Sequence, residues 1–218
     1  MRIARLVGIA ALAATVAHAQ TAEIAATVVD AQAHPVADAV VVAVPVDGSI
    51  RLQTRVRDDS VDQVDKEFFP RVKAILVGTS VTFPNHDNIR HHVYSFSPAK
   101  RFELPLYAGA PAQPVVFDKP GVVVLGCNIH DWMIGYIYVS ESPWFAKTGK
   151  DGKAILTELP PRAYIVRVWH PQQDVPEETT RKTVDATAAH RVDVEWKLAL
   201  KPEVRVRRSP TAERGGRY

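Results

Sequence analysis

Short apolar runs separated by polar turns dominate this chain, and no long stretch has the apolar period of an amphipathic helix. The runs are rich in Val, Ile, Phe and Tyr, and clusters of Pro, Gly, Asp and Asn divide them. This pattern predicts an all-β architecture of the sandwich type. Residues 98–115 are predicted to hold an irregular turn or a short helix. The predicted strands are 24–29, 39–44, 72–76, 80–83, 92–95, 121–126, 135–139, 153–157, 163–169 and 188–197.

Two stretches far apart in the sequence share one pattern of strand, turn and strand. The first is "ATVVDAQAHPVADAVVVAVP" (26–45), and the second is "TGKDGKAILTELPPRAYIVRVWHP" (148–171), with its Asp-Gly and Pro-Pro turns. Together they resemble the transthyretin-like module found beside carboxypeptidases, although in that family the two pieces follow each other directly. The resemblance implies one small β module split by an insertion. Two ordinary β-hairpins are the alternative interpretation.

The first residues have the composition of an export signal. Arg2 and Arg5 precede an apolar run over 6–17, and Ala17-His18-Ala19, with a small residue on either side of the histidine, suits a signal peptidase. The run is shorter than the roughly 20 residues that span a bilayer, which disfavours a transmembrane anchor. We therefore predict a signal peptide over 1–19 and a mature protein in the periplasm, with no transmembrane segment.

Charge points to no particular class of partner. The formal net charge is +3, and it falls to +1 when Arg2 and Arg5 are removed with the signal. The remaining basic excess lies in residues 201–218, which the composition predicts to be a disordered tail. No part of the chain predicts binding to nucleic acid.

The sequence also contains no recognisable catalytic motif. It has neither a nucleophile pattern nor a phosphate-binding loop. The neighbouring acids Glu177–Glu178 and Asp58–Asp59 are interpreted as solvated charge, because adjacent residues of a strand face opposite sides. We therefore expect that this protein is not an enzyme.

The single cysteine of the chain, Cys127, is accompanied by other metal-binding residue types. One cysteine excludes an internal disulfide, and a free thiol in an oxidising compartment is a liability unless it is buried or bound. In "CNIHDWM", His130 and Met133 follow Cys127 at intervals of three residues, on a short loop between two predicted strands. His91 and His92 begin another predicted strand after a polar turn. A buried apolar thiol is the alternative interpretation of the cysteine.

These residue types favour copper. A thiolate, two imidazoles and a weakly bound thioether describe an electron-transfer copper site. Zinc usually takes Cys and His alone and seldom accepts methionine. The sequence therefore predicts one bound copper ion, held by ligands from a strand and a loop.

Three segments of the middle region, "GTSVTFPN" (78–85), "HHVYSF" (91–96) and "CNIHDWMIGYIYV" (127–139), resemble the cupredoxins. Within that family they are most similar to the amicyanin and plastocyanin-like small blue copper proteins. The resemblance implies a Greek-key β-sandwich, inserted in or packed beside the second small β-sandwich. It implies one type 1 copper ion with four ligands, namely His91, Cys127, His130 and Met133. His92 stands where the family usually has asparagine, so it either hydrogen-bonds between the two ligand loops or replaces His91 at the metal.

The same resemblance implies a division of the chain and a function. The divisions are a first part of the transthyretin-like module over 20–57, a copper domain over 58–142 and a second part over 143–200. The implied function is the transport of single electrons, with c-type cytochromes or an amine-oxidising enzyme as partners, and the docking patch includes Trp132, Pro84 and Pro111. A periplasmic copper carrier or chaperone without an electron-transfer role is the first alternative. An accessory binding protein of the cell envelope is the second.

Overall fold

The computed structural model describes residues 21–50, 57–110, 113–187 and 191–202, and this part of the chain is almost entirely β. The predicted signal peptide, Pro111 and residues 203–218 of the predicted tail lie outside the described residues. Within the described residues, no helix has the length and apolar character needed to cross a bilayer. The elements are β1 (Ala22–Asp30), β2 (Val40–Pro45), β3 (Asp58–Ser60), β4 (Asp62–Val64), β5 (Glu67–Phe69), β6 (Val72–Leu76), β7 (Thr79–Thr82), β8 (His91–Ser97), β9 (Lys100–Tyr107), β10 (Val115–Phe117), β11 (Gly121–Gly126), β12 (Ile134–Ser140), β13 (Trp144–Lys147), β14 (Lys153–Leu159), β15 (Ala163–Trp169), the 3-10 helix η1 (Glu177–Thr180), β16 (Lys182–Asp185) and β17 (Arg191–Leu198).

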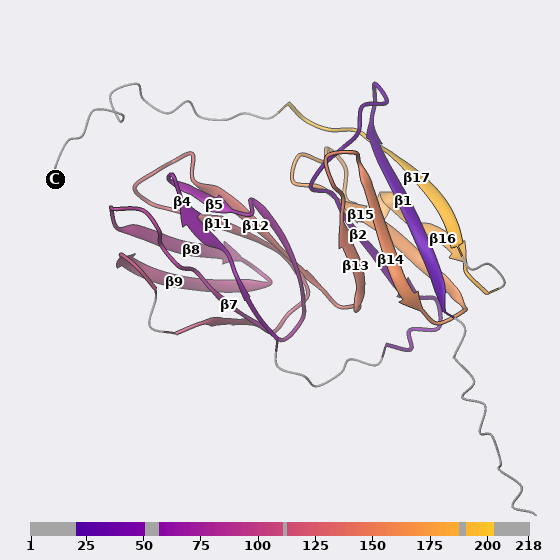
Figure 1. The fold of residues 1–218 in the computed structure, drawn as a ribbon, viewed down its shortest axis with the longest axis horizontal. Helices are drawn as coiled ribbons and strands as arrows, with labels where there is room; N and C mark the ends of the chain where they lie inside the picture. The colour runs from indigo at the N-terminus through magenta and orange to yellow at the C-terminus, as the bar shows by residue number, and fades with distance from the viewer. Residues whose placement is uncertain (1–20, 51–56, 111–112, 188–190, 203–218) are drawn as a thin grey trace, which may run out of the picture.

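The middle of the chain forms one sandwich, drawn in purple and magenta in Figure 1. Its larger sheet has the order β6-β12-β11-β8-β9, and the smaller sheet has the order β10-β7-β3. Side chains alternate across β11, where Val123 and Leu125 are buried while Val124 is exposed. They meet Phe83 and Phe117 from the other layer in one apolar core. The predicted all-β sandwich is confirmed.

The two ends of the described chain build a second sandwich, drawn in indigo, orange and yellow in Figure 1. Its sheets have the orders β14-β1-β17 and β13-β2-β15-β16. The first strand, β1, pairs antiparallel with β14 and parallel with the last strand, β17. Ile24, Val41, Tyr164 and Trp196 share the core between the two sheets. The two stretches with the same strand–turn–strand pattern therefore pack against each other, although the first sandwich separates them in sequence.

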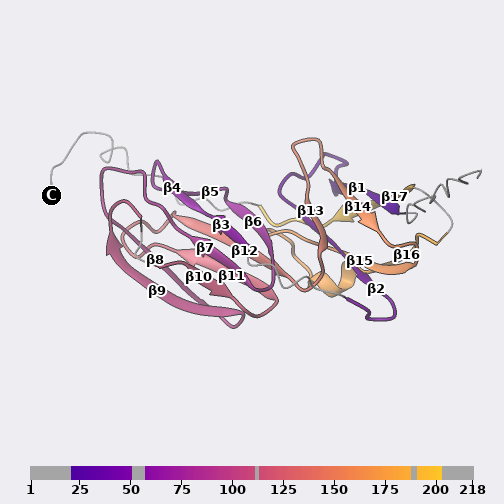
Figure 2. The ribbon, with the colours of Figure 1, turned by 60° about the horizontal axis from the view of Figure 1, so that its bottom comes forward.

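The two sandwiches meet on the outer face of β12, and Figure 2 shows them end to end along the molecule. Val42 of β2 and Tyr138 of β12 are buried in a third apolar cluster. The ring of Trp169 lies 5.9 Å from that of Tyr136 and 5.6 Å from that of Tyr138. The strand β12 therefore connects this junction with the loop that carries His130.

A partly buried ionic network reinforces this junction. The Arg167 guanidinium donates to Glu177 at 2.6 Å and also to Glu141, and the Tyr138 hydroxyl donates to Glu177. The Glu177 side chain is only 19% exposed. The interpretation of Glu177 as solvated charge is therefore wrong, whereas Glu178 forms an exposed pair with Arg181.

Within 98–115 the structure has the strand β9 over residues 100–107, which was not predicted, and no helix among the described residues of this range. The expected turns are confined to residues on either side of the strand. This strand lies at the edge of its sheet and pairs only with β8 among the named strands. An edge position tolerates Pro105, whose missing N–H interrupts the usual strand signal. The other strands that the pattern did not predict, such as β3 and β10, are too short to show a period of two.

Two glycines with the same backbone conformation allow strain and collision to be separated. Gly152 and Gly48 have φ of +71° and +69°, a region that other residues rarely adopt. A Cβ on Gly152 would lie 2.5 Å from the Val28 carbonyl oxygen, whereas a Cβ on Gly48 meets nothing within 4 Å. We expect Gly48→Ala to cost about 1 kcal/mol through backbone strain, and Gly152→Ala to cost roughly 1–3 kcal/mol more. Denaturant unfolding of both variants measures the difference, and equal losses would contradict this close approach.

Candidate metal centre

Two segments carry the predicted ligands. His91 is the first residue of β8, and Cys127, His130 and Met133 lie on the loop between β11 and β12. Two backbone bonds close this loop, from the Met133 N–H to the His130 carbonyl at 2.9 Å and from the Ile134 N–H to the Trp132 carbonyl at 3.0 Å. The tight turn directs the loop back toward the start of β8.

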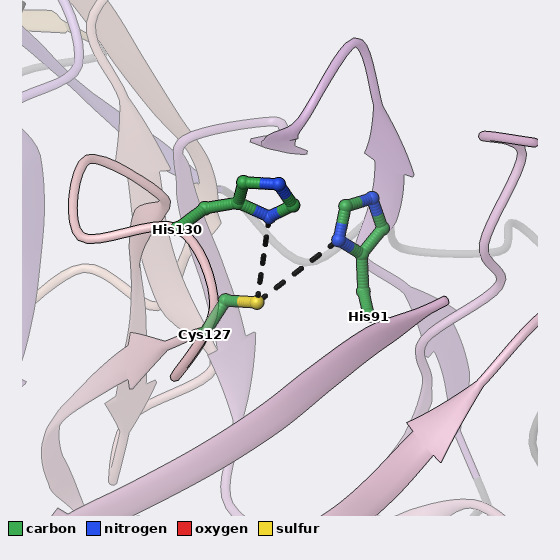
Figure 3. Close-up of side chains that lie close together, drawn as sticks. All are labelled: His91, Cys127 and His130. Atoms are coloured by element: carbon green, nitrogen blue, oxygen red, sulfur yellow. Dashed lines mark hydrogen bonds between the residues drawn. The ribbon is translucent and has the colours of Figure 1, made fainter. Parts of the chain in front are cut away.

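Three of the predicted ligands converge on one point, as Figure 3 shows. The Cys127 Sγ lies 4.0 Å from Nδ1 of His91 and 3.8 Å from Nδ1 of His130. All three donor atoms lie within 4.8 Å of one another, and the two imidazole centroids are 5.0 Å apart. Each residue thus presents its metal-binding atom to the same space.

The spacing of these atoms suits a single metal ion. An ion bonded to sulfur at about 2.3 Å and to nitrogen at about 2.0–2.1 Å separates the two donors by about 3.6–3.8 Å. The observed separation of 3.8 Å lies at the upper end of this range, and that of 4.0 Å lies just above it. A site of one thiolate and two imidazoles therefore fits copper or zinc without rearrangement of the strands.

Met133, the fourth predicted ligand, is fully buried and belongs to the same apolar cluster as Cys127. Its position on the loop and its burial keep the thioether away from water. Its service as an axial ligand stays a prediction.

His92 has a different environment from His91. Adjacent residues of a strand point to opposite faces, and the His92 ring pairs with Glu103 at 2.9 Å and lies 5.3 Å from the ring of Tyr94. Among the described residues, the cluster of possible ligands includes His91 and not His92. The backbone N–H of His92 does reach the site, because it hydrogen-bonds to the sulfur of Cys127.

The surroundings of Cys127 favour the thiolate. Burial raises the pKa of its thiol, but the hydrogen bond with His91 and those from the backbone N–H groups of Ile129 and His92 outweigh this effect. The net result is a pKa below the ordinary value. Because the thiolate is the form that binds metals, the site is prepared for a soft cation.

The sequence reasoning did not identify Asp87, which holds His91 from behind. Its carboxylate accepts a hydrogen bond from Nε2 of His91 at 2.6 Å. Burial lowers the pKa of His91, whereas the contacts with Cys127 and Asp87 raise it, and the net shift is upward. Metal-binding histidines commonly donate their second ring N–H to a carboxylate in this way. The sequence signal for Asp87 was the presence of an acidic residue in a polar turn, four residues before a histidine.

Acid is expected to weaken copper binding, because the ligands must lose their protons first. The pKa of His91 is raised above 6.5, so a proton competes for its Nδ1 as the pH falls below that raised value. Each displaced proton lowers the affinity by about tenfold per pH unit. Chelator competition from about pH 8 to about pH 5 measures this dependence. An affinity that does not change with pH would contradict ligation by His91 and Cys127.

Comparison with known proteins gives partial matches to cupredoxins. No protein-family model and no curated protein matches the chain. Among solved structures, a purple cupredoxin from Nitrosopumilus maritimus is 26% identical, covers 38% of this chain and 100% of its own, and has a TM-score of 0.34. A reduced amicyanin variant is 20% identical, covers 45% of this chain and 98% of its own, and has a TM-score of 0.34.

An enzyme is also among the similar structures. The Cu-containing nitrite reductase NirK from Thermus scotoductus SA-01 is 29% identical over 53% of this chain, with a TM-score of 0.36. The match spans 28% of that enzyme's chain.

Proposed function

We propose that this protein is an exported mononuclear type 1 copper protein that carries single electrons between redox partners. The observation that supports it best is the convergence of the Cys127 sulfur with Nδ1 of His91 and of His130, at 4.0 and 3.8 Å. These three residues would hold the copper ion, and Met133 would be its weak axial ligand. The bound copper supplies the exchange of one electron between Cu(I) and Cu(II).

The protein's part in this function is to keep the ligands still. Asp87 fixes the His91 ring, and two backbone N–H groups hold the Cys127 sulfur. His91 and Cys127 are buried in a β-sandwich, and the second sandwich covers the outer face of its strand β12. Such a framework favours one ligand arrangement for both oxidation states, so that little has to move when an electron is transferred.

We further propose that electrons enter and leave near His130. This side chain is partly exposed, and its ring lies 5.1 Å from that of Trp132. Ile129, directly before it in sequence, and Ile134, four residues after it, are 47% and 41% exposed. A small apolar surface of this kind suits the weak docking of a redox partner, such as a c-type cytochrome or an amine-oxidising enzyme.

In this proposal each part of the chain has a distinct task. Residues 1–19 direct export to the periplasm and are removed, residues 58–142 form the copper domain, and residues 20–57 with 143–200 form its scaffold. The alternative function, a copper carrier without an electron-transfer role, would use the same ligands. The burial of Cys127 and His91 argues for retention of the metal rather than its release to another protein.

A redox titration of the copper-loaded mature protein, followed by absorption, tests the proposed function. We expect one electron per protein, and we expect the oxidised spectrum to return unchanged over repeated cycles. The His34→Gln variant serves as a control, because His34 is an exposed histidine paired with Asp30 in another part of the molecule. Loss of copper on each cycle, or binding of Cu(I) alone, would favour the carrier instead.

A further inference from the structure

The hairpin β4–β5 touches both segments that carry the predicted ligands. Its strands are joined by the two-residue turn Asp65-Lys66, and their residues pair from Asp62 with Phe69 to Val64 with Glu67. We propose that this hairpin is a clamp for the metal centre and that Asp87 is the positioning residue that fastens it. The metal-dependent part of this inference rests on the proposed function, whereas the clamp itself is a property of the metal-free protein.

The first attachment is the turn of the hairpin. The Asp87 Oδ1 accepts the Asp65 N–H at 2.7 Å, and its Oδ2 accepts the Lys66 N–H at 2.8 Å. Asp65 and Lys66 have φ of 53° and 61°, a left-handed conformation that is unfavourable for residues other than glycine. The Oδ2 atom of Asp87 also accepts from Nε2 of His91 at 2.6 Å. One carboxylate therefore holds both the strained turn and the buried histidine.

The second attachment is made by strand β5. Phe68 of β5 is buried, and it packs against Gly135, the second residue of β12. A Cβ on Gly135 would lie only 2.9 Å from the Cβ of Phe68, so the approach requires glycine. Since β12 begins directly after Met133, this contact fixes the end of the loop that carries Cys127 and His130.

A third set of contacts anchors the hairpin between these two points. Gln63 of β4 is fully buried, and its Nε2 donates to the Phe83 carbonyl at 2.9 Å and to the Tyr107 hydroxyl at 2.6 Å. Its backbone carbonyl accepts the His86 N–H at 2.9 Å, one residue before Asp87. The hairpin is thus fixed at its turn, at its middle and against β12.

The carboxylate also selects the useful form of the imidazole. An ionised carboxylate only accepts hydrogen bonds, so its contact with Nε2 keeps a ring proton there. The proton that the imidazolium loses is therefore the one on Nδ1, which faces Cys127. Asparagine at position 87 has only one side-chain oxygen, which cannot accept from the N–H groups of Asp65, Lys66 and His91 as the two carboxylate oxygens do. Its amide N–H₂ group would donate to Nε2 and thereby favour the opposite tautomer, in which a proton on Nδ1 occupies the metal position.

Asp87→Asn, compared with Asp118→Asn, tests the clamp. Asp118 is an exposed carboxylate paired with Lys100 and serves as the matched control. In the metal-free protein in alkaline buffer, nitrogen NMR of His91 is expected to show the Nε2–H tautomer, and Asp87→Asn is expected to shift it toward Nδ1–H. Amide exchange at Asp65 and Lys66 is expected to accelerate in this variant alone. A wild-type tautomer with wild-type exchange in Asp87→Asn would overturn the proposal.

The metal-dependent readout is the affinity for Cu(I). We expect Asp87→Asn to lower it by about 10–100-fold, the usual effect of losing the carboxylate behind a histidine ligand, and Asp118→Asn to leave it unchanged. An unchanged affinity in Asp87→Asn would overturn the role of Asp87 at the metal. If the wild-type protein binds no copper, the proposed function fails, and the tautomer and amide exchange still decide whether the clamp exists.

Gly135→Ala provides an independent variant at the other attachment, where it would displace Phe68. We expect this variant to accelerate amide exchange at Asp65 and Lys66 although Asp87 is intact. We also expect the double variant Asp87→Asn/Gly135→Ala to lose less copper affinity than the product of the two separate losses, since both act through the same hairpin. If the two losses of affinity multiply in the double variant, the two attachments act independently and do not form one clamp.

Discussion

Cys127→Ser is expected to bind Cu(I) at least about 100-fold more weakly than the unmodified protein. Loss of a residue that hydrogen-bonds to a metal ligand lowers the affinity by about 10–100-fold, and loss of the ligand itself is expected to cost more. The thiol is the only sulfur atom among the three clustered donors, and its pKa is already lowered by His91 and two backbone N–H groups. A serine hydroxyl at this position does not ionise and does not offer a soft donor. Competition with a Cu(I) chelator measures the affinity directly.

Variants at the two histidines make this result specific. His91→Gln and His130→Gln are expected to weaken binding as well, whereas His34→Gln is expected to leave it unchanged, because His34 is exposed and paired with Asp30. Unfolding of the metal-free variants shows whether each is folded at the temperature of the titration. Undiminished Cu(I) binding by folded Cys127→Ser would mean that Cys127 is a buried apolar thiol.

Arg167→Ala is expected to lower the free energy of unfolding by about 1–4 kcal/mol, between the roughly 0–1 kcal/mol of an exposed ion pair and the roughly 3–5 kcal/mol lost when one partner of a buried pair is removed. The guanidinium contacts both Glu141 and Glu177, whose side chains are 30% and 19% exposed. Without it, two partly buried carboxylates near each other lose their counterion. The Tyr138 hydroxyl, which donates to Glu177, also becomes part of an incomplete network. Denaturant unfolding measures the loss.

Arg181→Ala is the matched control for this prediction. Arg181 pairs with Glu178, but both side chains are about half exposed or more, and such surface pairs contribute roughly 0–1 kcal/mol. The triple variant Arg167→Met/Glu141→Gln/Glu177→Gln is expected to recover part of the stability, since it removes the unpaired charges. If Arg167→Ala costs no more than Arg181→Ala, the junction between the sandwiches depends on its apolar contacts alone.

The amino-acid pattern predicted three of the strands to the residue. The strands β6, β11 and β15 begin and end at the predicted residues, because each combines β-branched residues with clear turn signals at both ends. The edge strand β9 was not predicted, since Pro105 and several charged residues conceal its alternation. Short strands such as β4 and β5 depend on long-range packing, and no local pattern indicates them.

The candidate site was predictable only in part, for a related reason. Chemistry and spacing single out Cys127, His130 and Met133, whereas His91 was preferred to His92 only through the resemblance to cupredoxins. The structure brings Cys127, His130 and His91 together. The contribution of Asp87 depends on backbone N–H groups at Asp65 and Lys66, which are distant in sequence and adjacent only in the fold. Contacts made through the main chain leave no trace in residue type, so they required the structure.

The visible absorption spectrum of the mature protein loaded with Cu(II), recorded beside that of Cys127→Ser, tests the copper site most directly. The proposed site predicts an intense blue band from charge transfer between the Cys127 thiolate and Cu(II). This band should bleach on addition of a reductant and be missing from the variant. A protein that stays colourless with Cu(II), or a band that survives in Cys127→Ser, would contradict a type 1 copper site at Cys127.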